Sequence, residues 1–459
     1  MNKNNNQVYI KLSEVKALDT YEQNYNVSPK YSGIDIASVF AKLKNGGIKV
    51  SLKSGAFQKG FNDKVTKELI HDMTGFRIIE FKDNLEKPKA TLRSCSESFN
   101  ISNKGKKESN FWQVSRFSYV HFENEEFVIR NSKAHCFIVI HDELVMKLFY
   151  DFKSPISRNE IEGKYKDIPS NIIDFFIEAE IISPCSDEKV SEESENDVLR
   201  QWAFHDLLFH SMSRTGRTEK DIGGSFRFKG VLPPQPPLKE NVWKDNSIVL
   251  PKPNLQWLNF NDKPFTNVLE SRSSIRNYGV LPLSLEQLGE FLYRSARVRY
   301  EYSSDYGEFI SKPYPGGGAN YETEFYITIN TCAGVPRGVY YYDPKEHILS
   351  LVSEPNDEME KLLYDAYMAT ALQGMPQILI TLANRFNRFN WKYSSMSYAA
   401  QLKNIGAIYQ TLYLVATSMG IGACGLGVGN TERFSRLTGL NYFEEGSVGE
   451  FMIGRPLLN

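Results

Sequence analysis

The stretch from Lys312 to Asn330 reads KPYPGGGANYETEFYITIN. Three consecutive glycines, Gly316 to Gly318, come directly before a predicted strand that contains Phe325 and Ile327. Glycine at such a place allows the backbone to approach a flat ligand closely, although a flexible loop explains this segment better when it is taken alone. The stretch contains neither G-x-G-x-x-G nor G-x-x-x-x-G-K-[ST], so it supports neither a dinucleotide-binding fold nor a P-loop.

A second glycine-rich stretch, residues 418–430, reads SMGIGACGLGVGN and follows a predicted helix. That helix has an apolar stripe that includes Ile405, and the apolar residues on its other sides predict burial nearly all round. Gly420 ends the helix, and four more glycines follow around Ala423 and Cys424. Cys424 has no histidine near it in the sequence, so packing of small residues explains it better than nucleophilic catalysis.

The segment SRSSIRNYGV at residues 271–280 gathers basic and hydroxyl side chains. Arg272, Arg276 and three serines lie within six residues, just before a helix that begins with a capping box at Ser284 and Gln287. Guanidinium groups and hydroxyls in this arrangement suit a phosphate, which accepts bidentate contacts from arginine. A solvated basic turn is an equally good interpretation of this segment alone.

The segment RFNRFNWKYSSMSYAAQ at residues 385–401 places Lys392 and Tyr393 together, between a predicted apolar strand and a long helix. A Lys–Tyr pair in a partly apolar site can transfer protons, because burial lowers the pKa of a lysine towards neutrality. A surface lysine beside a packed tyrosine is the ordinary explanation for any single pair of this kind.

Composition excludes several classes of protein. The 459 residues carry 54 Lys and Arg against 55 Asp and Glu, which argues against a whole-surface binder of nucleic acid or of a membrane. Five scattered cysteines form no C-x-x-C pair, and His205 and His210 lack the spacing of a metal helix, so no metal site is expected. With no signal peptide and no apolar run long enough to span a membrane, the sequence predicts a cytoplasmic protein.

Two polar stretches separate the parts of the chain. Residues 183–197, SPCSDEKVSEESEND, are acidic and nearly free of apolar side chains, and residues 229–254 hold six prolines that favour an extended, semi-rigid segment. Before them, three short predicted helices and a strand form a winged-helix pattern, with a capping box at Ser157 and Glu160. The third helix is acidic, so docking of a peptide or protein fits this module better than DNA binding.

Taken together and in order, these segments resemble the nitroreductase-like flavoproteins. They resemble most closely the SagB-type oxidases, which form thiazole and oxazole rings in ribosomally made peptides. The resemblance covers about residues 199–459 and rests on SRSSIR, PYPGGGANYETEFY, the predicted hairpin that begins with GVYYYDP, the WKY segment, and GIGACGLG followed by FMIGRP. It departs from the family pattern at Gly316, where relatives often have serine, and at SSMSYAA, where relatives are commonly rich in arginine.

The resemblance implies FMN bound at the interface of an α+β homodimer, with no metal. It assigns catalysis to Lys392 and Tyr393. The residues that it implies for FMN binding fall into four groups: Arg272, Ser273, Ser274 and Arg276 at the phosphate and pyrimidine edge; Pro315, Gly316, Gly317 and Gly318 against the ring; Ala423, Cys424 and Gly425 near its N5 side; and Arg455 as a further phosphate contact.

The resulting fold prediction is a nitroreductase-like α+β domain, with a central sheet flanked by helices, that follows one or more winged-helix-like domains. Relatives use modules of that shape to bind the leader segment of a precursor peptide. Four parts are predicted. Residues 1–125 form an uncertain α/β part, for which a second winged-helix-like unit is one interpretation, and residues 126–185 form a winged-helix-like peptide-recognition module. Residues 186–254 are a linker with a short helical insert, and residues 255–459 form the FMN oxidoreductase domain.

The predicted function is FMN-dependent dehydrogenation of thiazoline or oxazoline rings in a precursor peptide, with Lys392 and Tyr393 in proton abstraction and FMN N5 as the hydride acceptor. A cyclodehydratase complex is a further expected partner. Two alternatives stay open: an NAD(P)H-dependent nitro or quinone reductase, and a non-catalytic docking subunit of a peptide-modifying complex.

Overall fold

The computed structural model describes residues 88–96, 98–99, 109–166, 171–304 and 307–457, together with the backbone of strands at 7–12, 48–51, 56–57 and 77–82. The chain divides into two compact units, Met1–Asp221 (unit 1) and Ile222–Asn459 (unit 2). The boundary between them falls inside the predicted linker. No described helix is long and apolar enough to cross a membrane.

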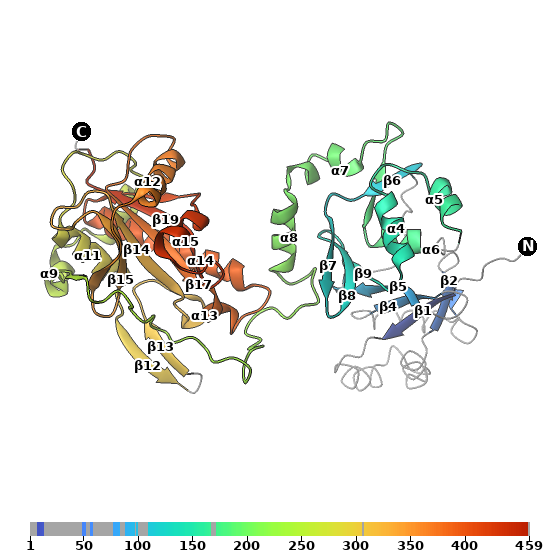
Figure 1. Ribbon diagram of the computed structural model, residues 1–459, viewed down its shortest axis with the longest axis horizontal. Coiled ribbons are helices and arrows are strands. Elements are labelled where there is room, and N and C mark those ends of the chain that lie inside the picture. Colours follow the sequence, from blue (N-terminus) through green and yellow to red (C-terminus); the bar gives the residue numbers. More distant parts are fainter. Residues whose placement is uncertain are drawn as a thin grey trace, which may run out of the picture. The chain divides into compact units, whose positions relative to one another are not determined.

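Unit 1 contains an antiparallel sheet of eight strands in the order β3-β2-β1-β4-β5-β9-β8-β7 (Figure 1). The strands of this sheet are β1 (Gln7–Leu12), β2 (Ile48–Ser51), β3 (Ala56–Phe57), β4 (Arg77–Lys82), β5 (Pro88–Ser94), β7 (Ser118–Glu123), β8 (Glu126–Asn131) and β9 (Cys136–Ile140).

Three short helices follow this sheet: α4 (Glu143–Asp151), α5 (Arg158–Lys164) and α6 (Asn171–Glu178). They share a buried core to which Val145, Ile161 and Phe176 contribute. β10 (Ile182–Cys185) then pairs antiparallel with β6 (Phe111–Val114), and the predicted capping box is present at the start of α5. The order of three helices and a strand is the predicted one. The winged-helix assignment and the predicted domain boundaries stay predictions.

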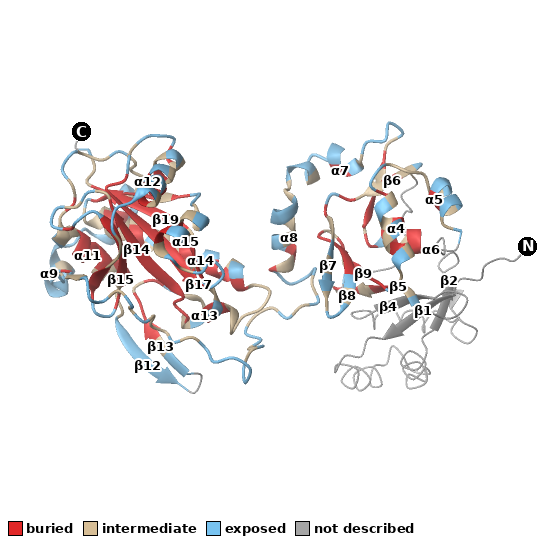
Figure 2. Cartoon of the chain, in the orientation of Figure 1, coloured by how far each residue is buried: buried red, intermediate tan, exposed pale blue. Residues whose placement is uncertain are grey.

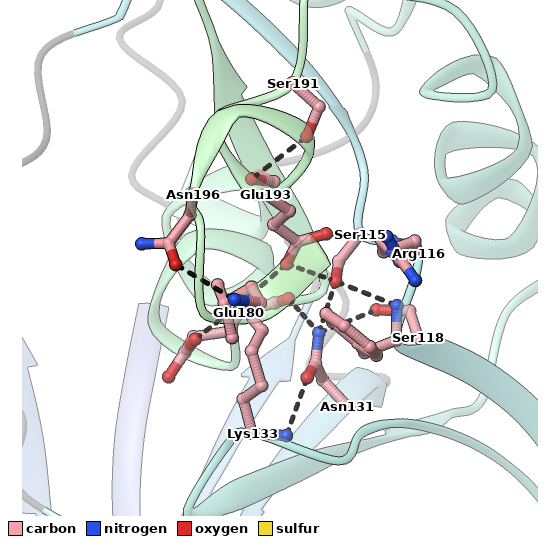
Figure 3. Close-up of polar contacts among 12 residues, drawn as sticks. Ser115, Arg116, Ser118, Asn131, Lys133, Glu180, Ser191, Glu193 and Asn196 are labelled. Carbon is pink, nitrogen blue, oxygen red and sulfur yellow. Dashed lines mark hydrogen bonds and ion pairs between the residues drawn. The ribbon is translucent and has the colours of Figure 1, made fainter. Parts of the chain in front are cut away.

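The acidic stretch 183–197 is folded onto unit 1 through a buried carboxylate. Glu193, in α7 (Glu192–Glu195), is 2 % exposed. It accepts hydrogen bonds from the Ser115 hydroxyl (2.7 Å) and the Arg116 N–H (3.0 Å), and pairs with Lys133 (2.6 Å) (Figure 3). A buried carboxylate is stable only with such partners, so these contacts fix the stretch. The short helical insert follows as η3 (Leu199–Gln201) and α8 (Phe204–Met212).

Unit 2 is built on an antiparallel sheet of seven strands in the order β11-β16-β15-β14-β17-β19-β18 (Figure 1). These strands are β11 (Ser247–Val249), β14 (Thr323–Ile329), β15 (Gly338–Asp343), β16 (Ile348–Ser353), β17 (Ile378–Arg385), β18 (Gly422–Leu426) and β19 (Glu445–Gly454). A separate ribbon pairs β12 (Tyr300–Ser304) with β13 (Gly307–Ser311). The predicted hairpin around Asp343 is confirmed as β15–β16.

Helices cover both faces of this sheet, which makes unit 2 a three-layer α+β domain. Ile380 of β17 packs in one core with α11 (Leu285–Ala296) and α14 (Ser397–Ser418), whereas its neighbour Leu379 packs in another with α12 (Asp357–Ala369) and α15 (Thr431–Thr438). Successive strand residues face opposite sides, so burial of every residue in β14 and β17 (Figure 2) requires both layers. The remaining helices are α9 (Leu255–Asn261), α10 (Phe265–Ser271), α13 (Phe386–Asn390) and η4 (Gly317–Ala319).

The long helix differs from its prediction. The apolar stripe of α14, with Ile405, Ile408 and Leu412, is buried as expected. Burial nearly all round is wrong, because Lys403, Gly406 and Gln410 are exposed on the opposite side. The sequence misleads here because this exposed side carries few charges, and a helix without charges is usually a buried one.

Candidate active site

α14 connects all four of the segments singled out in the sequence. η4 follows Pro315 and carries the three glycines into β14, and α13 leads from the end of β17 to Lys392 and Tyr393, just before α14 begins. β18 follows the end of α14 and pairs with β19. Gly420, Gly422 and Gly425 do have the G-x-G-x-x-G spacing, but Gly420 follows the end of α14 and the other two lie in β18. The chain therefore runs from helix to strand, the reverse of the order in a dinucleotide site.

The Lys–Tyr pair lies against the glycine loop. The Lys392 ammonium is 3.5 Å from the Gly318 carbonyl oxygen, and a Cβ added at Gly318 would overlap the Tyr393 hydroxyl. Gly318 has φ +59°, and Ala319 and Tyr321 are also left-handed, at +53° and +46°. Residues other than glycine rarely adopt such angles, and strained backbone of this kind concentrates at functional sites. The structure thus brings the segments 312–330 and 385–401 together.

The environment shifts the pKa values of this pair in opposite directions. Burial, helped by the positive charge of Arg388, lowers the pKa of the Lys392 ammonium. Burial, helped by the carboxylate of Glu322, raises the pKa of the Tyr393 phenol. The Tyr393 ring also stacks on Phe389, with ring centres 4.7 Å apart. Both shifts favour the uncharged form of each group more than in free solution.

Asn404 of α14 fixes the glycine loop. The Gly317 N–H donates to Asn404 Oδ1 (3.0 Å), and Asn404 Nδ2 donates to a carboxylate oxygen of Glu322 (2.8 Å). Glu322 is buried, and burial raises the pKa of its carboxyl group. Sequence reasoning missed both residues. Two signals were available: Glu322 is a charged residue at the start of an apolar strand, and Asn404 is an amide in an apolar helix.

Tyr413, further along α14, joins the segments 271–280 and 418–430. Its hydroxyl oxygen accepts the Gly425 N–H (2.7 Å) and lies 2.9 Å from Ser274 Oγ. The Ile275 N–H donates to the Ala423 carbonyl (2.9 Å), which holds the two segments edge to edge. Tyr413 was also missed, although a tyrosine within an apolar helix usually has a partner for its hydroxyl.

Three arginines near this end of the sheet lack carboxylate partners among the described residues. The Arg272 guanidinium lies 5.2 Å from the centre of the Tyr413 ring, and neither it nor Arg276 forms an ion pair there. Arg455 contacts Gln287 Oε1 (3.3 Å), and its Nε is buried with no hydrogen-bond partner. An anion with several acceptor oxygens would satisfy such donors.

The remaining predicted residues occupy simpler positions. Ser273 and Pro315 are exposed, and Gly316 packs against the Tyr321 ring. The Cys424 side chain is buried in the same core as Leu379, so only its backbone is available to a ligand, and its interpretation as a packing residue is confirmed. No group of three or more His, Cys, Asp or Glu in the described part of the chain is placed to hold a metal ion.

Comparison with known families defines the class of protein. The nitroreductase family model matches residues 269–455, and the model of the cyanobactin oxidase ThcOx matches residues 112–219. Residues 269–455 therefore form a nitroreductase-family domain, and the chain is an oxidoreductase. The chain combines this domain with a cyanobactin-oxidase segment, which confirms the resemblance to the SagB-type nitroreductase-like oxidoreductases.

Individual relatives match parts of the chain. "Putative nitroreductase MJ1384" of Methanocaldococcus jannaschii is 29 % identical over 161 residues, 35 % of this chain and 77 % of its own length. The trifolitoxin-processing protein TfxB of Rhizobium leguminosarum bv. trifolii is 26 % identical over 118 residues, 25 % of this chain and 32 % of TfxB. A chain of the E. coli microcin synthetase McbBCD complex with truncated pro-MccB17 bound is 19 % identical, with a TM-score of 0.35, over 53 % of this chain and 85 % of that chain.

Proposed function

We propose that this oxidoreductase is an FMN-dependent dehydrogenase that converts thiazoline or oxazoline rings of a ribosomally made precursor peptide to thiazole or oxazole. The observation that carries the proposal is the Lys392–Tyr393 pair packed against Gly318. A plain nitro or quinone reductase has no need of a positioned base. The cyanobactin-oxidase segment and the likeness to a trifolitoxin-processing protein support a peptide as substrate.

The residues present fit FMN. Among the described residues, Arg272 and Arg276 have no carboxylate partners and the buried Arg455 Nε has no hydrogen-bond acceptor, as expected beside an anionic phosphate. Gly318 cannot carry a side chain, and Gly425 places its backbone directly against Tyr413. Backbone that approaches this closely suits a flat ring. FMN, when bound, would supply the hydride acceptor for the oxidation.

The chain's own residues would manage the proton. Oxidation of an azoline removes the Cα proton together with a hydride from the neighbouring ring carbon. Lys392 is the proposed base, because its lowered pKa increases the fraction of neutral amine near neutral pH. Tyr393, whose phenol stays protonated, would orient the amine or the substrate by donating a hydrogen bond. Because the product ring is aromatic, the protein mainly has to position substrate and base.

The site is proposed to be completed by a second copy of the chain. Asn404 and Tyr413 are nine residues apart on α14, which is about 13 Å along the axis and about half a turn around it. The Lys392 cluster and the arginine cluster therefore flank the helix on opposite sides, and one ligand cannot easily touch both in one chain. The exposed side of α14, with Gly406 and Gln410, carries only Lys403 as a charged residue. A weakly charged face of this kind suits a homodimer interface.

Unit 1 is the proposed peptide-binding part of the protein. A leader segment bound there would hold the precursor peptide while its rings reach the oxidoreductase domain, which raises their effective concentration. A cyclodehydratase that forms the azoline rings is a further proposed partner.

The test is an absorbance scan of the purified protein from 300 to 550 nm, followed by turnover of two substrates. We expect flavin bands, release of FMN on heating, and oxidation of an azoline-containing precursor peptide in air. Rapid NAD(P)H consumption with a nitro compound and no oxidation of the peptide would favour the reductase alternative. A protein that stays colourless when FMN is added would favour a docking subunit.

A further inference from the structure

The segment of residues 222–239, here called the strap, wraps the Lys–Tyr segment. Gly223 and Ser394 form an isolated antiparallel bridge, and the Phe226 N–H donates to the Lys392 carbonyl (3.1 Å). Neither family model matches the strap, which lies between residues 219 and 269. It is also the first part of unit 2 and follows directly on unit 1 in the chain.

The proline-rich half of the strap is fastened through its carbonyl groups. Trp391 Nε1 donates to the Leu232 carbonyl (2.7 Å), and the Arg388 guanidinium donates to the Gln235 carbonyl. Arg385 donates to the carbonyls of Pro236 and Pro237, both at 2.9 Å. Proline has no N–H to donate, so a proline-rich segment can be held only by donors from elsewhere. Here all the donors come from the end of β17, from α13 and from Trp391, the residue before Lys392.

Phe226 connects this strap to the lysine side chain. Its ring meets Trp391 edge to face, with ring centres 6.0 Å apart, and the Lys392 ammonium lies 5.8 Å from the Phe226 ring centre. The ammonium also lies 5.3 Å from the centre of the Tyr393 ring. Phe226 has φ +49°, an unfavourable angle for a bulky residue. Surrounding contacts must hold such a conformation, and the hydrogen bond to the Lys392 carbonyl and the Trp391 contact do so.

We propose that Phe226 is a positioning residue that holds the Lys392 side chain near the Tyr393 ring, at the Gly318 carbonyl. This inference rests on the proposed role of Lys392 as the base. Lysine has a long, flexible side chain, and a base is effective only when its amine is held at the reacting proton. The strap fixes both ends of Lys392: its carbonyl through the Phe226 N–H, and its amine through the Phe226 ring.

The test compares Phe226→Leu with Phe228→Leu, which makes the same change two residues further along the strap. Lys392 in the flavin-loaded protein is acylated with an N-hydroxysuccinimide ester over a range of pH, and mass spectrometry gives the pH of half-maximal labelling. Phe226→Leu should raise this pH by about half a unit or more, because loss of the ring exposes the Lys392 amine to water and so raises its pKa. Loss of a cation–π attraction would by itself lower the pKa of the amine and hence the labelling pH. The Phe226 ring lies near the outer limit of about 6 Å for this attraction, so its loss should not reverse the expected rise in the labelling pH.

The other groups that bear on Lys392 are Arg388 and the Tyr393 phenol, with Glu322 behind the phenol. The Phe226 variants leave all three in place. In turnover of the azoline peptide, Phe226→Leu should lower kcat about 10-fold with little change in KM. Phe226→Tyr, which keeps a ring, should restore both the labelling midpoint and kcat. Should Phe226→Leu fold poorly, Phe226→Gly removes the ring in a residue that adopts φ +49° without strain, and it should show the same two effects.

The inference is wrong if Lys392 labels at the same midpoint pH in Phe226→Leu (or in Phe226→Gly, used in its place) as in Phe228→Leu. It is also wrong if Phe226→Tyr loses as much kcat as Phe226→Leu. Labelling does not require a substrate. A shifted midpoint in a protein that fails to oxidise the peptide would therefore uphold the positioning of Lys392 and contradict the proposed function.

Discussion

The two ends of α14 organise different kinds of chemistry. Near Asn404, backbone is strained, side chains are closely packed, and the pKa values of a lysine and a tyrosine are shifted in opposite directions. Near Tyr413, hydrogen bonds align two backbone segments, and the arginines beside them have no carboxylate partners within the part of the chain that the structure describes.

The difference separates catalysis from cofactor retention. A lysine with a lowered pKa near a carbonyl suits exchange of a proton, whereas guanidinium groups without carboxylate partners among the described residues suit binding of an anion. Substitutions of Lys392 and Tyr393 should therefore change turnover at constant flavin content. Substitutions at the Tyr413 end should change flavin content first.

The largest expected effect is at Lys392. Lys392→Ala should lower turnover of an azoline peptide by about 100-fold to 10,000-fold, the usual contribution of a general base. Its flavin absorbance should equal that of the unaltered protein, and Lys361→Ala on α12 serves as a control that should change neither. A colourless Lys392→Ala protein would show that this end of α14 also retains the cofactor. Catalysis and cofactor retention would then not be separated between the two ends of the helix.

The exposed side of α14 provides the next test. If two copies of the chain complete the site, this side forms their interface and brings the Asn404 end of one copy to the Tyr413 end of the other. Gly406→Glu should shift the protein from dimer to monomer in light scattering and lower its flavin content with it. Open space surrounds a Cβ added at Gly406, and glycine to glutamate favours the helix by up to about 1 kcal/mol, so the fold itself should not suffer. Met368→Glu, at an exposed methionine of α12, is the control. A dimer that survives Gly406→Glu with full flavin content would remove α14 from the interface.

At the Tyr413 end, Arg276→Ala should weaken FMN retention about 10-fold to 100-fold. A hydrogen bond between charged groups contributes about 1.5–3 kcal/mol, and no carboxylate in the described part of the chain pairs with Arg276 in its place. FMN affinity is measured by fluorescence titration of the apoprotein. Arg337→Ala, which removes an arginine already paired with Glu360 (2.6 Å), should leave the affinity unchanged. Equal affinities in the two variants would exclude Arg276 from the phosphate site.

The smallest effect is expected at Tyr413 itself. Tyr413→Phe leaves the Gly425 N–H without its acceptor, which costs about 1 kcal/mol and should lower FMN affinity about 5-fold. Tyr364→Phe, at an exposed tyrosine of α12, should have no effect. A loss of turnover in Tyr413→Phe at full flavin content would place catalysis at both ends.

The sequence predicted the elements of the site better than their connections. The capping box at Ser284, the β15–β16 hairpin and the positions of the four segments follow from local patterns, and all are present in the structure. Asn404 and Tyr413 contact residues that are distant in sequence, and a polar residue in an apolar helix does not reveal which residues those are. The burial of Glu193 in a stretch that looks like an open linker has the same cause, since its partners at residues 115, 116 and 133 cannot be read from its neighbours.

The central claim is tested most directly by the mass of a precursor peptide that carries azoline rings, incubated in air with the flavin-loaded protein. The account predicts the loss of two hydrogen atoms per oxidised ring with the unaltered protein, and no loss with an equally yellow Lys392→Ala protein over the same time. Oxidation of the peptide by Lys392→Ala at the full rate would contradict it.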